Sequence, residues 1–247
     1  MELATPRHQV TGISLERFIQ DSQNELEKLQ LDAHPLKAVC DRGLPRDREG
    51  GLWLEFGVGT GTTLGVLSAA RRHGLVYGFD WFQGLPEEWL PEFGLGKGSF
   101  AMDPPAEVPP NARLVHGRFE DTLAPFLAEH SGLPVDLAHV DCDVYGSTVT
   151  VLNGLTDRLP PGAVMVFDEL FFYEGCEGHE AKALYEWLSA TGKAYRWIGI
   201  QGHETGADVN RRAMDDPALK RTFLGPGNGI VPWDVPLKER AALILVE

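Results

Sequence analysis

The chain has 247 residues, of which 43% are hydrophobic and 23% are charged, as in ordinary globular proteins. This length allows one large domain or two small ones and is sufficient to bury a substantial core. Asp and Glu number 36 against 22 Lys and Arg, which gives a formal net charge of −14. Because nucleic acids and anionic membranes are bound by surplus positive charge, this balance argues against DNA, RNA or a membrane surface as the partner.

The cysteines and the first residues indicate the compartment. Cys40, Cys142 and Cys176 are isolated in the sequence and form no CxxC pair, which suits a reducing cytosol better than a disulfide-linked secreted fold. The opening residues, MELATPRHQV, show no basic region followed by an apolar one, and no apolar run reaches the length of a membrane span. We therefore expect a soluble, cytoplasmic protein.

Residues 1–50 are predicted to form a small N-terminal helical cap or arm. Within SLERFIQDSQNELEKLQ the apolar residues recur at helical spacing, and Ser14 stands where it caps the helix. HPLKAVCDRG predicts a second short helix that ends at Gly43. An amphipathic helix must bury its apolar stripe. This segment is therefore expected either to form a homodimer through its helices or to pack on its own domain.

From residue 52 onward, strand-like and helix-like segments alternate. The predicted strands are LWLEFGV, LVYGFD, ARLVHGRF, VDLAHVD, AVMVFDE, AYRWIGIQG and AALILVE. The predicted helices are TTLGVLSAARRHG, EDTLAPFLAEHSG, STVTVLNGLTDRL and EAKALYEWLSATG. This pattern predicts one doubly wound α/β domain over residues 51–247, with a mostly parallel, seven-stranded Rossmann-like sheet and helices on both faces. Residues 81–111 and 203–238, rich in Pro and Gly, are expected to be surface insertions.

A glycine-rich loop follows the first strand of this domain. LEFGVGTGTT places Gly57, Gly59 and Gly61 between the strand and its helix, where glycine lets the backbone bend sharply and approach a ligand. The dinucleotide fingerprint G-x-G-x-x-G would require a third glycine where Thr62 stands. Asp80 ends the second strand, where a carboxylate accepts hydrogen bonds from ribose hydroxyls. Together these residues predict a nucleoside cofactor, with NAD as an open alternative.

Four acidic residues are expected to meet at one edge of the sheet. Asp141 and Asp143 end the fourth predicted strand, and Asp168 and Glu169 end the fifth. Neighbouring parallel strands end at the same edge, so these carboxylates repel one another unless they are compensated. A hard cation such as Mg²⁺ relieves the repulsion because it takes oxygen ligands. The alternative is that Asp168 and Glu169 cap the next helix while Asp141 bonds loop amides.

These motifs resemble one enzyme family. LEFGVGTG, GFDWFQGLPEEW, VDCDVYGST and LPPGAVMVFDE, in this order over roughly residues 52–200, are similar to the class I S-adenosylmethionine-dependent methyltransferases of the macrocin O-methyltransferase type. The resemblance implies that Asp141, Asp168 and Glu169 bind Mg²⁺ and that Asp143 is the general base. The better-known sugar-modifying members have two aspartates where this chain has Asp168 and Glu169, and the longer glutamate would shift the cation.

The resemblance also implies a cofactor and a reaction. The predicted S-adenosylmethionine contacts are Glu55, Gly57, Gly59, Gly61, Asp80, Trp81, Phe119, Glu120 and Asp141, with Phe119 and Glu120 beside the adenine. The predicted reaction is Mg-assisted O-methylation of a small-molecule acceptor, such as a sugar, a polyketide or a catechol-like natural product, with Asp141 and Asp143 as the catalytic pair. The cation would lower the pKa of the acceptor hydroxyl, and Asp143 would accept its proton.

Other assignments stay open on the sequence alone. A nicotinamide-dependent oxidoreductase can use the same sheet, although the third glycine and a Tyr-x-x-x-Lys pair are missing; a non-catalytic nucleoside-binding domain is the third possibility. His179 is either an alternative base or a capping residue. The aromatic residues that either roof the site or fill the core are Trp81, Phe82, Trp89, Phe93, Phe171, Phe172 and Tyr173. The sequence names neither the acceptor nor the methylated atom.

Overall fold

The computed structural model describes residues 5–91, 94–201 and 240–247. The helices are α1 (Leu15–Leu26), α2 (Pro35–Asp41), α3 (Thr62–Ala70), α4 (Phe119–Glu129), α5 (Tyr145–Leu155) and α6 (Glu180–Thr191), with short 3₁₀ turns at η2 (Thr156–Arg158) and η3 (Cys176–Gly178). The strands are β1 (Gln30–Leu31), β2 (Leu52–Phe56), β3 (Val76–Asp80), β4 (Ala112–His116), β5 (Val135–Val140), β6 (Val164–Phe167), β7 (Ala194–Gln201) and β8 (Ala241–Val246).

All the strands belong to one sheet, in the order β1-β7-β8-β6-β5-β2-β3-β4. The pairs are parallel except for the two that β8 makes with β6 and β7. The predicted doubly wound, mostly parallel fold is therefore confirmed, and the seven predicted strands are β2 to β8. Within the described residues the sheet has eight strands rather than seven. The additional strand, β1, is only two residues long and too short to give a periodic signal in the sequence.

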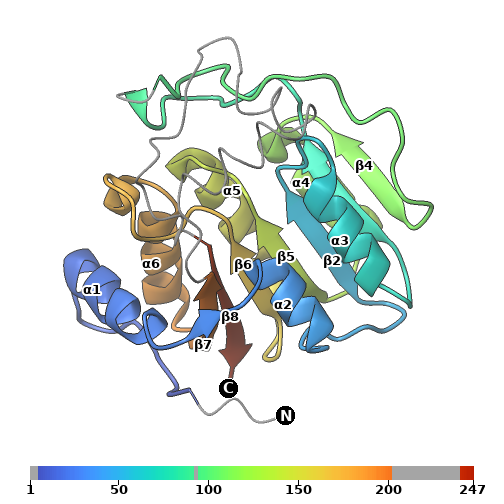
Figure 1. Ribbon diagram of the computed structural model, residues 1–247. Coiled ribbons are helices and arrows are strands. Elements are labelled where there is room, and N and C mark those ends of the chain that lie inside the picture. Colours follow the sequence, from blue (N-terminus) through green and yellow to red (C-terminus); the bar gives the residue numbers. More distant parts are fainter. Residues whose placement is uncertain (1–4, 92–93, 202–239) are drawn as a thin grey trace.

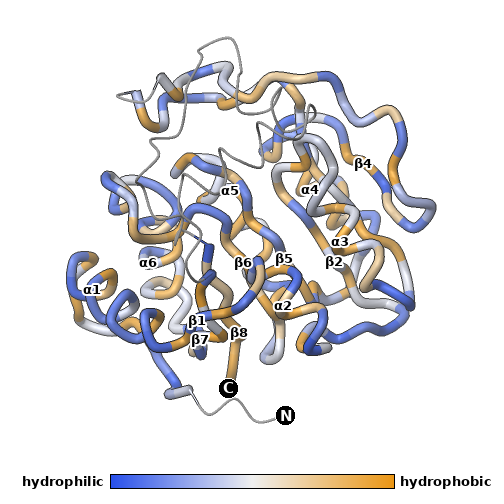
Figure 2. The backbone as a smooth tube through the Cα atoms, in the orientation of Figure 1, coloured by the Kyte–Doolittle hydropathy of each residue, from blue (hydrophilic) through white to orange (hydrophobic). Residues whose placement is uncertain are grey.

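Helices cover both faces of the sheet (Figure 1). One apolar core joins one face of the sheet to α1, α4, α5 and α6, and a second joins the other face to α2 and α3. The strands β2, β5 and β6 are buried along their whole length, as expected of parallel strands covered on both sides. Figure 2 shows hydrophobic residues along these inner strands and along β8.

The described part of the N-terminal segment packs within the same fold. Helix α1 begins after Ser14, whose side chain accepts a hydrogen bond from the backbone N–H of Arg17. Its apolar stripe, with Phe18 and Leu26 buried, packs against the core, and the Phe18 ring lies 5.7 Å from that of Tyr185 in α6. The structure thus shows the apolar stripe of α1 packed on its own domain, which is one of the two expected arrangements. A homodimer through these helices stays a prediction.

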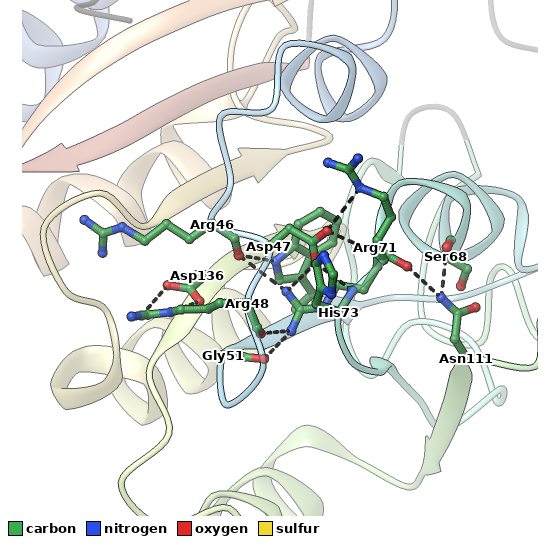
Figure 3. A network of polar contacts seen from close by, with 11 residues as sticks. Arg46, Asp47, Arg48, Gly51, Ser68, Arg71, His73, Asn111 and Asp136 are labelled. Atoms are coloured by element: carbon green, nitrogen blue, oxygen red, sulfur yellow. Dashed lines mark hydrogen bonds and ion pairs between the residues drawn. The ribbon is translucent and has the colours of Figure 1, made fainter.

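A polar network holds together the edge of the sheet where β2 and β5 begin (Figure 3). The side chain of Arg71 is 1% exposed and donates hydrogen bonds to the carbonyls of Arg48 and Gly51, at 3.0 and 2.5 Å. It also forms an ion pair with Asp47 at 3.3 Å and stacks over Trp53 at 5.0 Å. Burial lowers the pKa of Arg71, and the negative charge of Asp47 partly offsets this shift. Arg71 therefore joins the loop before β2 to the end of α3.

The two predicted insertions differ in how much of them is described. The segment 81–111, apart from residues 92 and 93, runs over the carboxyl edge of the sheet and forms an isolated bridge between Leu90 and Leu95. The predicted insertion 203–238 lies outside the described residues. In the part of the chain that is described, no helix is both long and apolar enough to cross a membrane.

Candidate active site at the carboxyl edge of the sheet

The glycine loop lies where the order of the strands reverses, between β2 and β5. In open α/β sheets this position is the usual ligand crevice. Gly57 has φ +97°, and a Cβ built on it would stand 2.0 Å from the backbone oxygen of Asp141. Only glycine allows this approach, so the loop packs directly against the end of β5. By contrast, no described atom lies within 4 Å of a Cβ built on Gly59, whose φ is +48°. Gly59 thus borders open space.

Replacement of Gly59 by alanine is expected to weaken S-adenosylhomocysteine binding at least about tenfold, or about 1.4 kcal/mol. The methyl group would project into the space that we assign to the cofactor, while the left-handed backbone costs about 1–2 kcal/mol of stability. Calorimetric titration measures the affinity. Gly132→Ala is the matched control, because Gly132 has φ +79° and equally open surroundings but follows α4. Equal affinity in the two variants would contradict a cofactor contact at Gly59.

Asp80, the last residue of β3, faces the glycine loop. Its Oδ2 accepts hydrogen bonds from the backbone N–H groups of Val58 and Gly59, at 2.9 and 3.0 Å. Its Oδ1 accepts a third from Phe82 at 2.7 Å. The carboxylate therefore fixes the shape of the loop. Each oxygen has two lone pairs, so the predicted contact with ribose hydroxyls is compatible with this role and stays a prediction.

Two of the predicted cofactor contacts, Trp81 and Glu120, lie against Arg118. The guanidinium of Arg118 lies 4.6 Å from the centre of the Trp81 ring and forms an exposed ion pair with Glu120 at 3.0 Å. Phe119 begins α4 and packs edge-on against Phe56 at 5.5 Å, so part of this side chain belongs to the core. Their contacts with a cofactor stay predictions.

Three carboxylates come together beside the loop. Asp141, Asp143 and Glu169 each offer an oxygen, and these oxygens lie within 4.8 Å of one another. Oε2 of Glu169 is buried and has no hydrogen-bond partner in the described part of the chain. Asp143 has φ +59°, a left-handed conformation that aspartate tolerates better than most residues. This donor set fits a hard divalent cation.

The electrostatics of this acidic group favour added positive charge. Burial, followed by the charges of Asp168 and Asp143, raises the pKa of Asp141 well above its usual value. Burial, followed by the charges of Asp168 and Asp141, also raises the pKa of Glu169 well above its usual value. A shared proton or a bound cation would relieve this repulsion.

Asp168 lies beside this group but has other partners. Its Oδ1 is 3.0 Å from Nε2 of His34 and 3.5 Å from Nε2 of His139, and its Oδ2 is 2.7 Å from Nε of Arg240. Burial alone would raise the pKa of Asp168, but the charge of Arg240 and the contacts with the two histidines hold it well below its usual value. Asp143, not Asp168, thus completes the group formed with Asp141 and Glu169. The predicted metal role of Asp168 stays untested.

Glu55, predicted as a cofactor contact, is fully buried next to His139. The two residues are register partners on β2 and β5, and Oε1 of Glu55 lies 3.0 Å from Nδ1 of His139. Burial alone would lower the pKa of His139, but the neighbouring carboxylates of Asp168 and Glu55 raise that pKa to about 10. His139 thus lies between two carboxylates. His139 stands two residues before Asp141, so both side chains point to the same side of the strand. This spacing is the sequence pattern that could have identified His139 as part of the site.

Glu180, the first residue of α6, connects the two acidic loops. Its Oε1 accepts a hydrogen bond from the backbone N–H of Cys142 at 3.1 Å, and its Oε2 accepts one from the backbone N–H of Glu169 at 3.3 Å. Burial, with the charges of Asp143 and Asp168, raises the pKa of Glu180 to about 8 against the effect of these hydrogen bonds. An acidic residue in the first turn of a helix is common, so no sequence pattern distinguishes Glu180 or predicts these two hydrogen bonds.

The aromatic residues divide between the core and the edge of the site. Phe171 is fully buried, and Tyr173 lies 6.2 Å from Trp89 of the segment 81–111. The same segment reaches the start of α5 through Glu87, whose Oε1 accepts a hydrogen bond from Gly146 N–H at 3.0 Å. Segment 81–111 is thus attached a few residues from Asp143. Phe93 lies outside the described residues, and His179 directly precedes α6.

Comparison with known proteins bears on the fold of this chain. The sequence model of a family described as a methyltransferase domain matches residues 54–170. A crystal structure of the calicheamicin methyltransferase CalS11 is 24% identical, with a TM-score of 0.51, and the match covers 74% of this chain and 78% of that one. This likeness supports the fold.

Two further solved structures are less similar. The apo structure of CalS11, described as a TDP-rhamnose 3'-O-methyltransferase, is 22% identical with a TM-score of 0.46, covering 75% of this chain and 82% of that one. The O-methyltransferase NovP is 16% identical with a TM-score of 0.44, covering 96% and 83%. No curated protein sequence matches the chain. The chain has a methyltransferase-like α/β fold, and its residues 54–170 match the model of the methyltransferase domain family.

Proposed function

We propose that the protein transfers a methyl group from S-adenosylmethionine to a hydroxyl group of a small molecule, assisted by Mg²⁺. The observation that carries this proposal is the contact between the glycine loop and the acidic group, in which Gly57 packs against the backbone of Asp141. A cofactor bound at Gly59 would therefore lie next to Asp141, Asp143 and Glu169. Proximity of this kind supplies much of the rate acceleration in a group transfer.

The carboxylates divide two tasks in this proposal. Asp141, Asp143 and Glu169 would hold the cation, which when bound lowers the pKa of an acceptor hydroxyl and orients it. A carboxylate has two oxygens, so Asp143 can face the cation with one and accept the hydroxyl proton on the other. The need for a base and a cation is what favours oxygen as the methylated atom, since an alcohol is a poor nucleophile near neutral pH.

A small acceptor fits the charge of the protein. The net charge of −14 disfavours nucleic acids and anionic membranes as acceptors. An acceptor with two neighbouring oxygens, as in a sugar, a polyketide or a catechol-like natural product, would chelate the cation. We place this reaction in the cytoplasm, in keeping with the isolated cysteines.

A thermal melt tests the cofactor. S-adenosylhomocysteine at roughly a hundred times its dissociation constant should stabilise the protein by about 2.7 kcal/mol. For a chain of this size the midpoint should rise by roughly 5–10 °C. NAD⁺ at the same concentration is the comparison, and it should leave the midpoint unchanged. A rise in the midpoint with NAD⁺ alone would contradict the methyltransferase and favour the nicotinamide-dependent oxidoreductase.

A further inference from the structure

The carboxylate of Asp168 connects three parts of the chain that are distant in sequence. His34 stands directly before α2 in the N-terminal segment, His139 lies in β5, and Arg240 directly precedes β8. All three side chains present nitrogen atoms to Asp168, at 3.0, 3.5 and 2.7 Å. Asp168 is 6% exposed, so these contacts replace most of its hydration.

The two histidines face Asp168 in different ways. Nδ1 of His34 accepts a hydrogen bond from the backbone N–H of Leu36 at 3.1 Å, so the ring proton of a neutral His34 is on Nε2, toward Asp168. Nδ1 of His139 lies 3.0 Å from Oε1 of Glu55, while its Nε2 lies 3.5 Å from Asp168 and has no hydrogen-bond partner in the described part of the chain. His34 therefore presents no nitrogen lone pair to Asp168, so this group cannot supply both rings to a metal ion.

The direction of the backbone separates Asp168 from Glu169. Asp168 and Glu169 follow β6, where the backbone bends, and their side chains join different groups. Glu169 joins the oxygens of Asp141 and Asp143, while Asp168 joins the histidines. The charge of Asp168 is also matched, because Arg240 forms an ion pair with it at 2.7 Å.

We propose that Asp168 is a positioning residue that does not bind the cation, and that Asp141, Asp143 and Glu169 hold it. Asp168 fixes the backbone on which Glu169 stands by joining it to the N-terminal segment and to β8. The backbone N–H of Gln201 donates to the carbonyl of Arg240 at 3.0 Å, so the end of β7 is held at the same point. This inference rests on the proposed function, and it departs from the metal set implied by the family resemblance.

Nuclear magnetic resonance of the wild-type protein tests this directly. The chain is labelled with ¹⁵N-histidine, saturated with S-adenosylhomocysteine and titrated with Mg²⁺, and His34→Gln and His139→Gln assign the two rings. We expect the ring N–H signals of both histidines, and the pattern of protonated nitrogens, to persist while calorimetry reports Mg²⁺ binding. Loss of these hydrogen-bonded signals on Mg²⁺ addition would show that Asp168 turns to the cation, which would overturn the proposal.

Two matched variants give a second measurement. Asp168→Asn should lower the Mg²⁺ affinity by less than about tenfold, whereas Glu169→Gln should lower it by more than about a hundredfold. Arg240→Met should reproduce the change that Asp168→Asn makes in the KM of the cofactor, and Arg240→Lys should restore the wild-type value. If Asp168→Asn fails to fold, Arg240→Met and the wild-type spectra decide the question.

The outcomes separate this inference from the proposed function. Mg²⁺ that binds the wild type but not Asp168→Asn overturns the inference alone. A wild-type chain that binds S-adenosylhomocysteine but no Mg²⁺ overturns both the inference and the assistance by Mg²⁺. A wild-type chain that binds Mg²⁺ but no S-adenosylhomocysteine overturns the methyltransferase and leaves the assignment of the cation ligands supported.

Discussion

Replacement of Asp143 by asparagine is expected to lower kcat about 10²- to 10⁴-fold, the usual contribution of a general base. Asparagine has nearly the same size and also tolerates the left-handed conformation at φ +59°, so the loop should keep its shape. It cannot accept the hydroxyl proton. The rate is measured as S-adenosylhomocysteine release at saturating Mg²⁺, with the acceptor that gives the fastest wild-type turnover in a panel of catechols, polyketides and sugars.

Binding measurements separate the base from a merely structural role. Asp143→Asn should bind S-adenosylhomocysteine within about twofold of the wild type, a difference of about 0.4 kcal/mol. Asp157→Asn is the control, because Asp157 is exposed in η2, away from the site, and its loss should leave kcat unchanged. Wild-type turnover in Asp143→Asn would remove Asp143 as the base.

Replacement of Arg71 by methionine is expected to destabilise the protein by about 3–5 kcal/mol, as when one partner of a buried ion pair is removed. The midpoint of thermal unfolding should fall by roughly 10 °C or more. Methionine fills much of the same space, but the carbonyl of Gly51 loses its donor in a buried position and that of Arg48 in a partly buried one. Chemical denaturation monitored by circular dichroism gives the free energy of unfolding.

Arg72 supplies a closely matched control. It forms an ion pair with the same Asp47, at 3.5 Å, but its side chain is 80% exposed. Exposed ion pairs contribute about 0–1 kcal/mol, so Arg72→Met should change the midpoint little. Equal losses in the two variants would mean that the charge near Asp47, and not the buried hydrogen bonds of Arg71, stabilises this edge.

Much of the fold could be predicted because it depends on periodic burial. Continuous apolar runs such as VMVF identify parallel strands covered on both faces, and the alternation with helices sets their direction. The strand β1 could not be predicted, since two residues have no period and its pairing with β7 depends on contacts far along the chain. The packing of α1 also depends on contacts far along the chain, so its apolar stripe alone predicts two outcomes.

The sequence located the acidic edge but not its internal arrangement. The ends of β5 and β6 bring Asp141 and Glu169 together through strand order alone. Whether Asp168 or Glu169 faces Asp141 and Asp143 depends on how the backbone turns after β6. The partners of Asp168 come from residues 34 and 240, far away in the sequence. Contacts over such separations leave no local pattern, so His34 and Arg240 were missed.

The place of β8 in the sheet has a consequence for how the chain matures during synthesis. This last described strand lies between β6 and β7 and pairs with both. Until residues 241–246 have left the ribosome, β6 and β7 both present open edges, which favour aggregation. Arg240, the neighbour of β8, reaches Asp168 only when this strand inserts. The nascent chain therefore completes its sheet and its polar site in the same late step.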